Sequence, residues 1–174
     1  MGRLTLAMLV LGPLLLAACS GGGLPVATEC APPPATATPR FDPFGGGSGG
    51  GRFRDYLLAI QPQLDQLQSL KNQFLLDHTS RTFSTDDSFR PAVAKFIDQS
   101  VCVATNLQGI SPPNAQQFVQ AAADEEAALS AYVAHLKAGR TAVATRNVTD
   151  YRTFYDNLEA KFDAVQRAYQ NPVR

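Results

Sequence analysis

The chain has 174 residues, with 15 basic and 15 acidic side chains and a formal net charge of zero. This balance excludes the basic footprint of nucleic-acid-binding proteins and leaves no polybasic patch for anionic lipid. Residues 19–174 alone are long enough for one domain with a hydrophobic core, and nothing in the composition identifies a substrate.

The first 18 residues have the layout of a cleaved export signal. Arg3 is followed by an uncharged run over residues 4–18. That run is shorter than the roughly 20 residues that a membrane-spanning helix needs. Gly12-Pro13 also interrupts it, which suits a removed signal better than a permanent span. We therefore expect residues 1–18 to be a signal peptide.

The uncharged run ends in Leu16-Ala17-Ala18-Cys19, which resembles the lipobox of bacterial lipoproteins. In that family the cysteine thiol is joined to diacylglycerol, the preceding peptide is cut and the new amine is usually acylated. The resemblance implies that Cys19 is lipidated and that its acyl chains hold the protein in a lipid bilayer. It also implies an extracytoplasmic location, on the cell membrane or on the outer membrane of a diderm organism. The alternative is an ordinary secretory signal with an incidental cysteine.

Residues 19–51 are predicted to be the lipidated cysteine and a disordered tether. Nine Gly and six Pro fall among residues 20–51, so this segment cannot bury enough apolar surface to offset its ordering entropy. One interpretation is a spacer that holds the domain away from the membrane. The alternative is a neutral linker that selection has not shaped.

A helical domain is predicted over residues 52–171, where apolar side chains recur at steps of three and four. The first helix spans 52–77, with a kink or a restart at Pro62. The second spans 87–108, capped by Asp87 and ended by Gly109.

The third helix is expected over residues 112–138, ended by Gly139. The fourth begins at Val148, or as early as Thr141, and Pro172 stops it. No strand is expected. The fold class is therefore all-α, an antiparallel up-down-up-down four-helix bundle.

This domain resembles the small helical lipoproteins of unassigned function found in bacterial envelopes. The points of similarity are Tyr56 through Pro62 and the layout from Pro112-Pro113 through Gly139 into the last helix. The resemblance covers residues 52–171 and concerns architecture only. It implies an envelope bundle and assigns no functional residues.

Sequence motifs for catalysis and metal binding are missing from this chain. It contains no C-x-x-C, no H-E-x-x-H, no phosphate-binding glycine loop and no Glu-x-x-His pair of the di-iron bundles. We therefore expect no catalytic residues, no metal and no cofactor.

Glu125 is the most unusual helical position, because it falls within the apolar stripe of the third helix. It is either a contact to a ligand or an edge residue that reaches solvent or pairs with an Arg; a buried carboxylate without a partner has a raised pKa. His78 and His135 are expected to be solvated. Asn147-Val148-Thr149 matches a glycosylation acceptor, which we interpret as a chance match.

Cys30 and Cys102 remain once acylation has used Cys19. Cys102 lies half a turn from the apolar stripe of its helix, so we expect it to face away from the core. The tether can lie back along that face, and the compartment beyond the membrane permits disulfides. We predict a Cys30–Cys102 disulfide, with two free thiols as the alternative.

Three functions follow from these features. The favoured one is a non-enzymatic interaction or structural module of the cell envelope, with an unknown envelope protein as partner. The second is a bundle that binds a small or lipidic ligand between its helices, near Glu125 and lined by Tyr132, Phe154 or Tyr155. An enzyme is the third, disfavoured because no nucleophile–base pair or metal set is visible.

Overall fold

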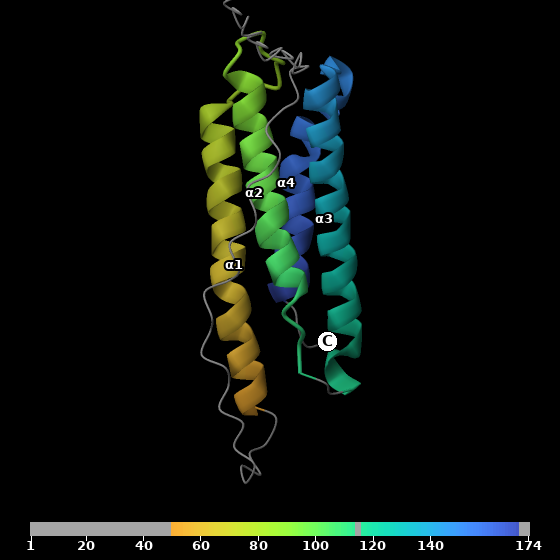
Figure 1. Ribbon diagram of the computed structural model, residues 1–174. Helices are drawn as coiled ribbons and strands as arrows, with labels where there is room; N and C mark the ends of the chain where they lie inside the picture. Colours follow the sequence, from red (N-terminus) through yellow and green to blue (C-terminus); the bar gives the residue numbers. More distant parts are fainter. Residues whose placement is uncertain (1–49, 114–115, 171–174) are drawn as a thin grey trace, which may run out of the picture.

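The computed structural model describes residues 50–113 and 116–170. These residues form four long α-helices and one short 3-10 helix, η1, and they contain no strand, which confirms the all-α prediction (Figure 1). The predicted signal peptide, residues 1–18, and nearly all of the predicted tether, residues 19–51, lie outside the described residues. The elements in chain order are α1 (Gly50–Asp77), α2 (Phe89–Gln108), η1 (Gln116–Phe118), α3 (Val119–Thr145) and α4 (Val148–Gln170).

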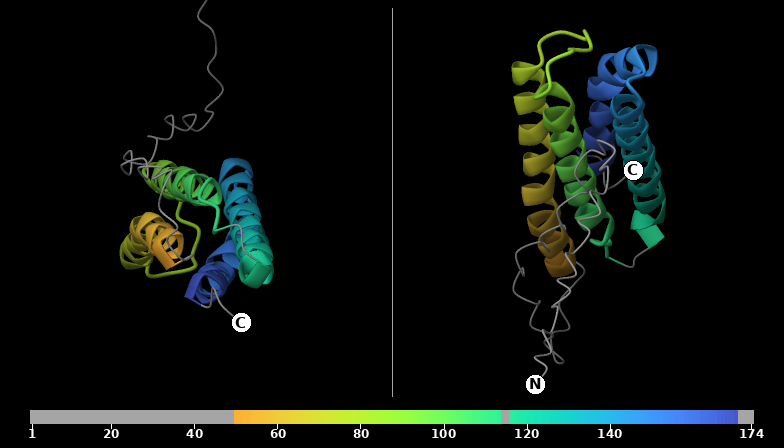
Figure 2. Two further views of the ribbon diagram at one scale, coloured as in Figure 1. Left: turned by 90° about the horizontal axis from the view of Figure 1, so that it is seen from below. Right: turned by 45° about the horizontal axis from the view of Figure 1, so that its top comes forward.

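The four long helices stand around a common interior, in chain order around the bundle (Figure 2, left). Among neighbouring long helices, α3 and α4 pack most extensively on each other, and α1 and α4 pack least. Contacts between aromatic rings join each end of α1 to a neighbouring element. Phe53 near the start of α1 stacks on Phe118 of η1 at 5.1 Å between ring centroids, and His78 beside the end of α1 meets Phe89 of α2 at 5.4 Å.

The core is continuous and rich in aromatic rings. Each helix contributes apolar side chains at steps of three and four, as expected for helices with one buried face. The innermost large side chains belong to all four helices, so no single pair of helices holds the core alone. They are Ile60, Leu67, Val93, Ile97, Leu107, Leu129, Tyr132, Leu136, Val143, Tyr151, Leu158 and Phe162.

The predicted starts of the first two helices needed small corrections. Helix α1 begins at Gly50 and runs through Pro62 without restarting, so the restart expected there was wrong. Helix α2 begins at Phe89 with Ser88 as its N-cap residue, and Asp87 does not cap it. Asp86 instead accepts hydrogen bonds from the backbone N–H and the hydroxyl of Ser88, which orders the turn before the helix.

The expected end of the third helix at Gly139 was wrong, because α3 continues to Thr145. Gly139 is buried against the ring of Phe154 from α4: a Cβ atom at Gly139 would lie 2.4 Å from Phe154 Cδ2. Glycine is needed here for close helix packing, not for a helix end. The predicted start was also too early, since η1 and then Val119 begin this element.

Helices α3 and α4 are joined by a tight corner at Arg146 and Asn147. Arg146 adopts a left-handed conformation with φ 56° and ψ 32°, which ends α3. The Asn147 side chain then accepts hydrogen bonds from the backbone N–H groups of Thr149 and Asp150, so it caps α4. This cap gives the Asn147-Val148-Thr149 sequence a structural role. Thr141 belongs to α3, so the earlier start considered for the fourth helix was wrong.

Candidate functional site around Glu125

Glu125 is a carboxylate inside the bundle, on the second turn of α3. Its side chain is 3% exposed, as its place in the apolar stripe predicted. Its Oε2 atom accepts a hydrogen bond of 2.6 Å from the Tyr56 hydroxyl of α1. The expectation that Glu125 reaches solvent or pairs with an Arg was therefore wrong. The partner is a tyrosine 69 residues earlier in the chain.

The protonation of Glu125 depends on two opposing effects. Burial raises the pKa of its carboxyl, and the hydrogen bond from Tyr56 partly lowers it. The second oxygen, Oε1, is buried and has no hydrogen-bond partner among the described residues. The charged form is therefore stabilised at one oxygen and left without a donor at the other.

Aromatic side chains extend from the Tyr56 partner of this carboxylate. Phe53 lies 6.3 Å from Tyr56 between ring centroids and stacks on Phe118. Tyr169 in the last turn of α4 is close enough that the Glu125 charge raises the pKa of its phenol, in addition to the larger effect of burial. We name Glu125, Tyr56, Tyr169, Phe53 and Phe118 the Glu125 cluster.

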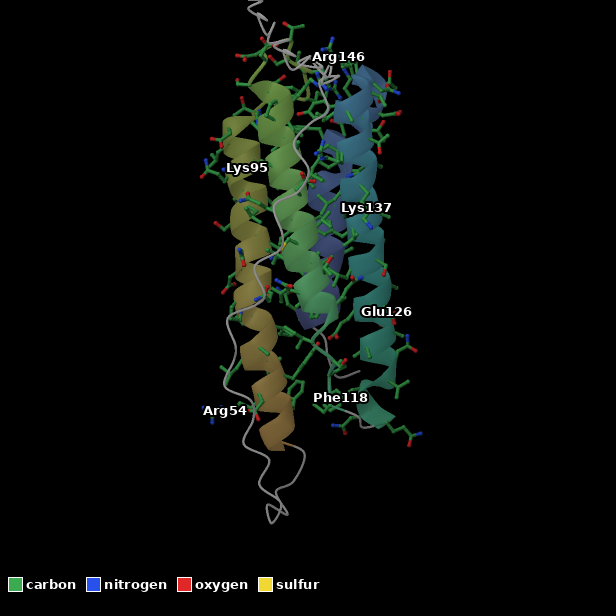
Figure 3. The ribbon with its side chains drawn as sticks, viewed as in Figure 1. Arg54, Lys95, Phe118, Glu126, Lys137 and Arg146 are labelled. Atoms are coloured by element: carbon green, nitrogen blue, oxygen red, sulfur yellow. The ribbon has the colours of Figure 1, made fainter. Side chains whose placement is uncertain are left out.

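The cluster lies at one end of the bundle. Figure 3 shows Phe118 and Arg54 at the end opposite Arg146. Tyr56 belongs to the second turn of α1 and Tyr169 to the last turn of α4. Parts of three helices and η1 therefore meet around one buried carboxylate.

The side chains expected to line a pocket at Glu125 lie elsewhere. Tyr155 donates a hydrogen bond to the backbone carbonyl of His78, at the far end of α1, roughly 33 Å along that helix from Tyr56. Phe154 packs on Gly139. Tyr132 contacts Phe162 inside the core. The sequence predicted Glu125 itself but none of its actual neighbours.

Both histidines are half-buried, so the expectation that they are solvated was wrong. His135 Nε2 lies 2.9 Å from the backbone carbonyl oxygen of Phe154. His78 packs against the rings of Phe74 and Phe89. Burial lowers the pKa of each imidazole, which favours the neutral ring. These are packing histidines at helix contacts, and neither touches the Glu125 cluster.

Lys71 is a second polar group inside the bundle, and helical periodicity did not predict its burial. Its side chain is 10% exposed and its Nζ lies 5.0 Å from the centroid of the Phe162 ring. Glu159 approaches it from α4 at 3.8 Å. This cation–π contact and ion pair join α1 to α4, two neighbouring helices whose backbones approach each other at few points.

Cys102 is half-buried on α2, outside the buried face of that helix. It is disulfide-bonded, and its partner lies outside the described residues. Cys19 and Cys30 are the two other cysteines of the chain. Both lie outside the described residues, so lipidation of Cys19 and pairing of Cys30 with Cys102 stay predictions.

Neither a metal site nor a membrane-spanning helix is found in residues 50–113 and 116–170. No three His, Cys, Asp or Glu side chains gather there in a way that would hold a metal ion. No helix in the same part of the chain is both long and apolar enough to cross a bilayer.

Comparison with protein-family models, with curated proteins and with solved structures finds no match for this chain.

Proposed function

We propose that this protein is a lipid-anchored, extracytoplasmic module of the bacterial cell envelope. The observation that carries the proposal is the Leu16-Ala17-Ala18-Cys19 sequence at the end of an uncharged run. Acyl chains on Cys19 hold the protein to the cell membrane, or to the outer membrane of a diderm organism. At about 0.8 kcal/mol per buried CH2 group, two or three such chains make release negligible.

The anchored domain is an up-down-up-down four-helix bundle. The Phe53–Phe118 contact joins the first residues of α1 to the element before α3, and the His78–Phe89 contact joins the end of α1 to the start of α2. Both contacts fit consecutive helices that run in opposite directions. Residues 20–49 join this bundle to the acylated cysteine.

The role of the bundle is to bind another envelope component or to serve a structural purpose, without catalysis. Its interior is filled by apolar and aromatic side chains from all four helices, which supports a rigid module whose outer faces do the binding. The partner is an unknown envelope protein. Crosslinking in intact cells, followed by purification from membranes, identifies it.

Metabolic labelling with radioactive palmitate tests the anchor. The wild-type protein incorporates the label and stays with the membrane fraction. The Cys19→Ser variant loses both properties because it lacks the thiol that is acylated. A serine variant that still incorporates palmitate would show that the lipobox assignment is wrong.

Ligand binding between the helices is the second candidate function. Glu125 favours it, because a buried carboxylate with an unpartnered oxygen is a ready acceptor for a ligand donor group. Native mass spectrometry of the purified protein tests this function. A co-purifying small molecule supports it, and its loss in Glu125→Gln places it at this carboxylate.

A further inference from the structure

The unpartnered oxygen of Glu125 is the feature from which we start. The carboxylate is fixed by the 2.6 Å hydrogen bond from Tyr56 to Oε2. Oε1 is buried and accepts no hydrogen bond from any described residue. An ionised carboxylate can accept several hydrogen bonds, and burying one with half of its capacity unused is costly. The free oxygen therefore offers a strong acceptor in fixed orientation.

Within residues 50–113 and 116–170, no positive side chain compensates the charge of an ionised Glu125. No Lys, Arg or His of the described residues forms an ion pair with Glu125. The two tyrosines that interact with it, Tyr56 and Tyr169, are neutral phenols, because burial and the carboxylate itself raise their pKa values. A bound cation would supply both the missing donor and the missing positive charge.

The surroundings of the carboxylate decide which kind of cation fits. The rings of Phe53 and Phe118 are stacked beside Tyr56, so the side chains next to the Tyr56–Glu125 hydrogen bond are aromatic. Aromatic faces attract ammonium groups through cation–π contacts and also accept apolar groups. A metal ion needs several oxygen ligands, and the described residues contain no such group.

We propose that the Glu125 cluster binds an organic ammonium ion attached to an apolar body. The ammonium N–H groups donate to Glu125 Oε1, and the apolar body lies against the aromatic rings of the cluster. A neutral alcohol of the same shape donates a hydrogen bond to Glu125 but leaves its negative charge unpaired. An ionised carboxylic acid is repelled by that charge. This inference rests on the second candidate function, ligand binding between the helices, and names the class of ligand. It does not depend on the lipid anchor.

Calorimetric titration of the purified mature protein tests the inference, with 2-phenylethylammonium as the probe and 2-phenylethanol as its neutral counterpart. We expect saturable binding of the ammonium with one site per chain. The alcohol binds at least about tenfold more weakly, which corresponds to about 1.4 kcal/mol, because it donates the hydrogen bond but leaves the negative charge of the carboxylate unpaired. Glu125→Gln weakens ammonium binding to a similar degree.

Glu126→Gln is the matched control, because Glu126 is the next residue of the same helix and is exposed. It removes one negative charge without touching the cluster, so it should bind the ammonium as the wild type does. The wild type also provides a readout that needs no substitution: ammonium binding weakens toward pH 4, where protonation of Glu125 removes the charge.

Three results would overturn the inference. The first is that the wild type shows no saturable binding of the ammonium. The second is that Glu125→Gln and Glu126→Gln lose ammonium affinity to the same degree. The third is that Glu125→Gln binds the ammonium as tightly as the wild type does. Equal binding of the alcohol and the ammonium, insensitive to Glu125, would overturn the ammonium class yet keep a bundle that binds apolar ligands. Absence of binding of either probe would leave the lipid anchor untouched, since palmitate labelling tests it separately.

Discussion

At the scale of single residues, Glu125 combines burial, one short hydrogen bond and one free oxygen. Burial raises the pKa of its carboxyl above the ordinary value of 4.5. The folded protein therefore holds this proton more tightly than the unfolded chain does. By linkage, the contribution of Glu125 to stability is fully present below pH 4.5 and is lost as pH rises through the folded-state pKa.

Glu125→Gln should remove this pH dependence. The amide keeps an oxygen for the Tyr56 hydroxyl but carries no charge, so the variant gains stability relative to wild type between pH 4 and pH 7.5. Urea unfolding of both proteins at the two pH values measures the difference. Glu126→Gln, which changes an exposed carboxylate, should follow the wild type. A constant gap between Glu125→Gln and wild type at both pH values would contradict the raised pKa.

The sequence could place Glu125 but not its partners. Helical periodicity is local, so the position of Glu125 on the apolar stripe followed from Phe118, Ala122 and Leu129 of the same predicted helix. Its hydrogen bond to Tyr56 joins residues 69 positions apart, and no local pattern encodes that register. For the same reason, helical periodicity did not predict that the ammonium of Lys71 is buried.

At the scale of helices, the boundaries predicted best were those set by local chemistry. Gly109 follows the end of α2 as predicted. The prediction that a helix ends at Gly139 was wrong. A glycine can end a helix or make room for a neighbouring ring, and the sequence alone does not distinguish the two. Only the position of the Phe154 ring distinguishes them.

Gly139→Ala should destabilise the domain. Alanine favours a helix over glycine by about 1 kcal/mol, but its Cβ would meet Phe154 Cδ2 at 2.4 Å. Overpacking of this kind costs about 1–3 kcal/mol, so we expect a net loss of about 1 kcal/mol in the free energy of unfolding, measured in urea.

The Phe154→Leu background is the control for this substitution. The smaller side chain leaves room for the methyl group, so Gly139→Ala should be neutral or stabilising there. A stabilising effect in the wild-type background would mean that helix propensity decides this position and that close packing does not.

At the scale of the whole molecule, two features connect the bundle to the N-terminal part of the chain. Helix α1 begins at Gly50, the first described residue, and Cys102 of α2 is disulfide-bonded to a cysteine outside the described residues. If Cys19 is acylated, Cys30 is the cysteine that remains. A bridge to Cys30 would hold the tether against α2 and shorten the free spacer.

Alkylation of the mature protein purified without reductant tests this bridge. We expect no thiol to react with iodoacetamide before reduction and two to react after it, counted by intact mass. The closed loop stabilises the fold by up to about 4 kcal/mol in the chain-entropy model, and by less where the tether stays flexible. Two reactive thiols before reduction would rule the bridge out.

The proposed membrane anchor requires cleavage before Cys19 and lipidation of its thiol. Mass spectrometry of the mature N-terminal peptide measures both most directly. Our account predicts a peptide that begins at Cys19 and carries the added mass of a diacylglyceryl group, with or without a further acyl chain on its amine. A mature chain that begins at any other residue, or an unmodified Cys19, would contradict it.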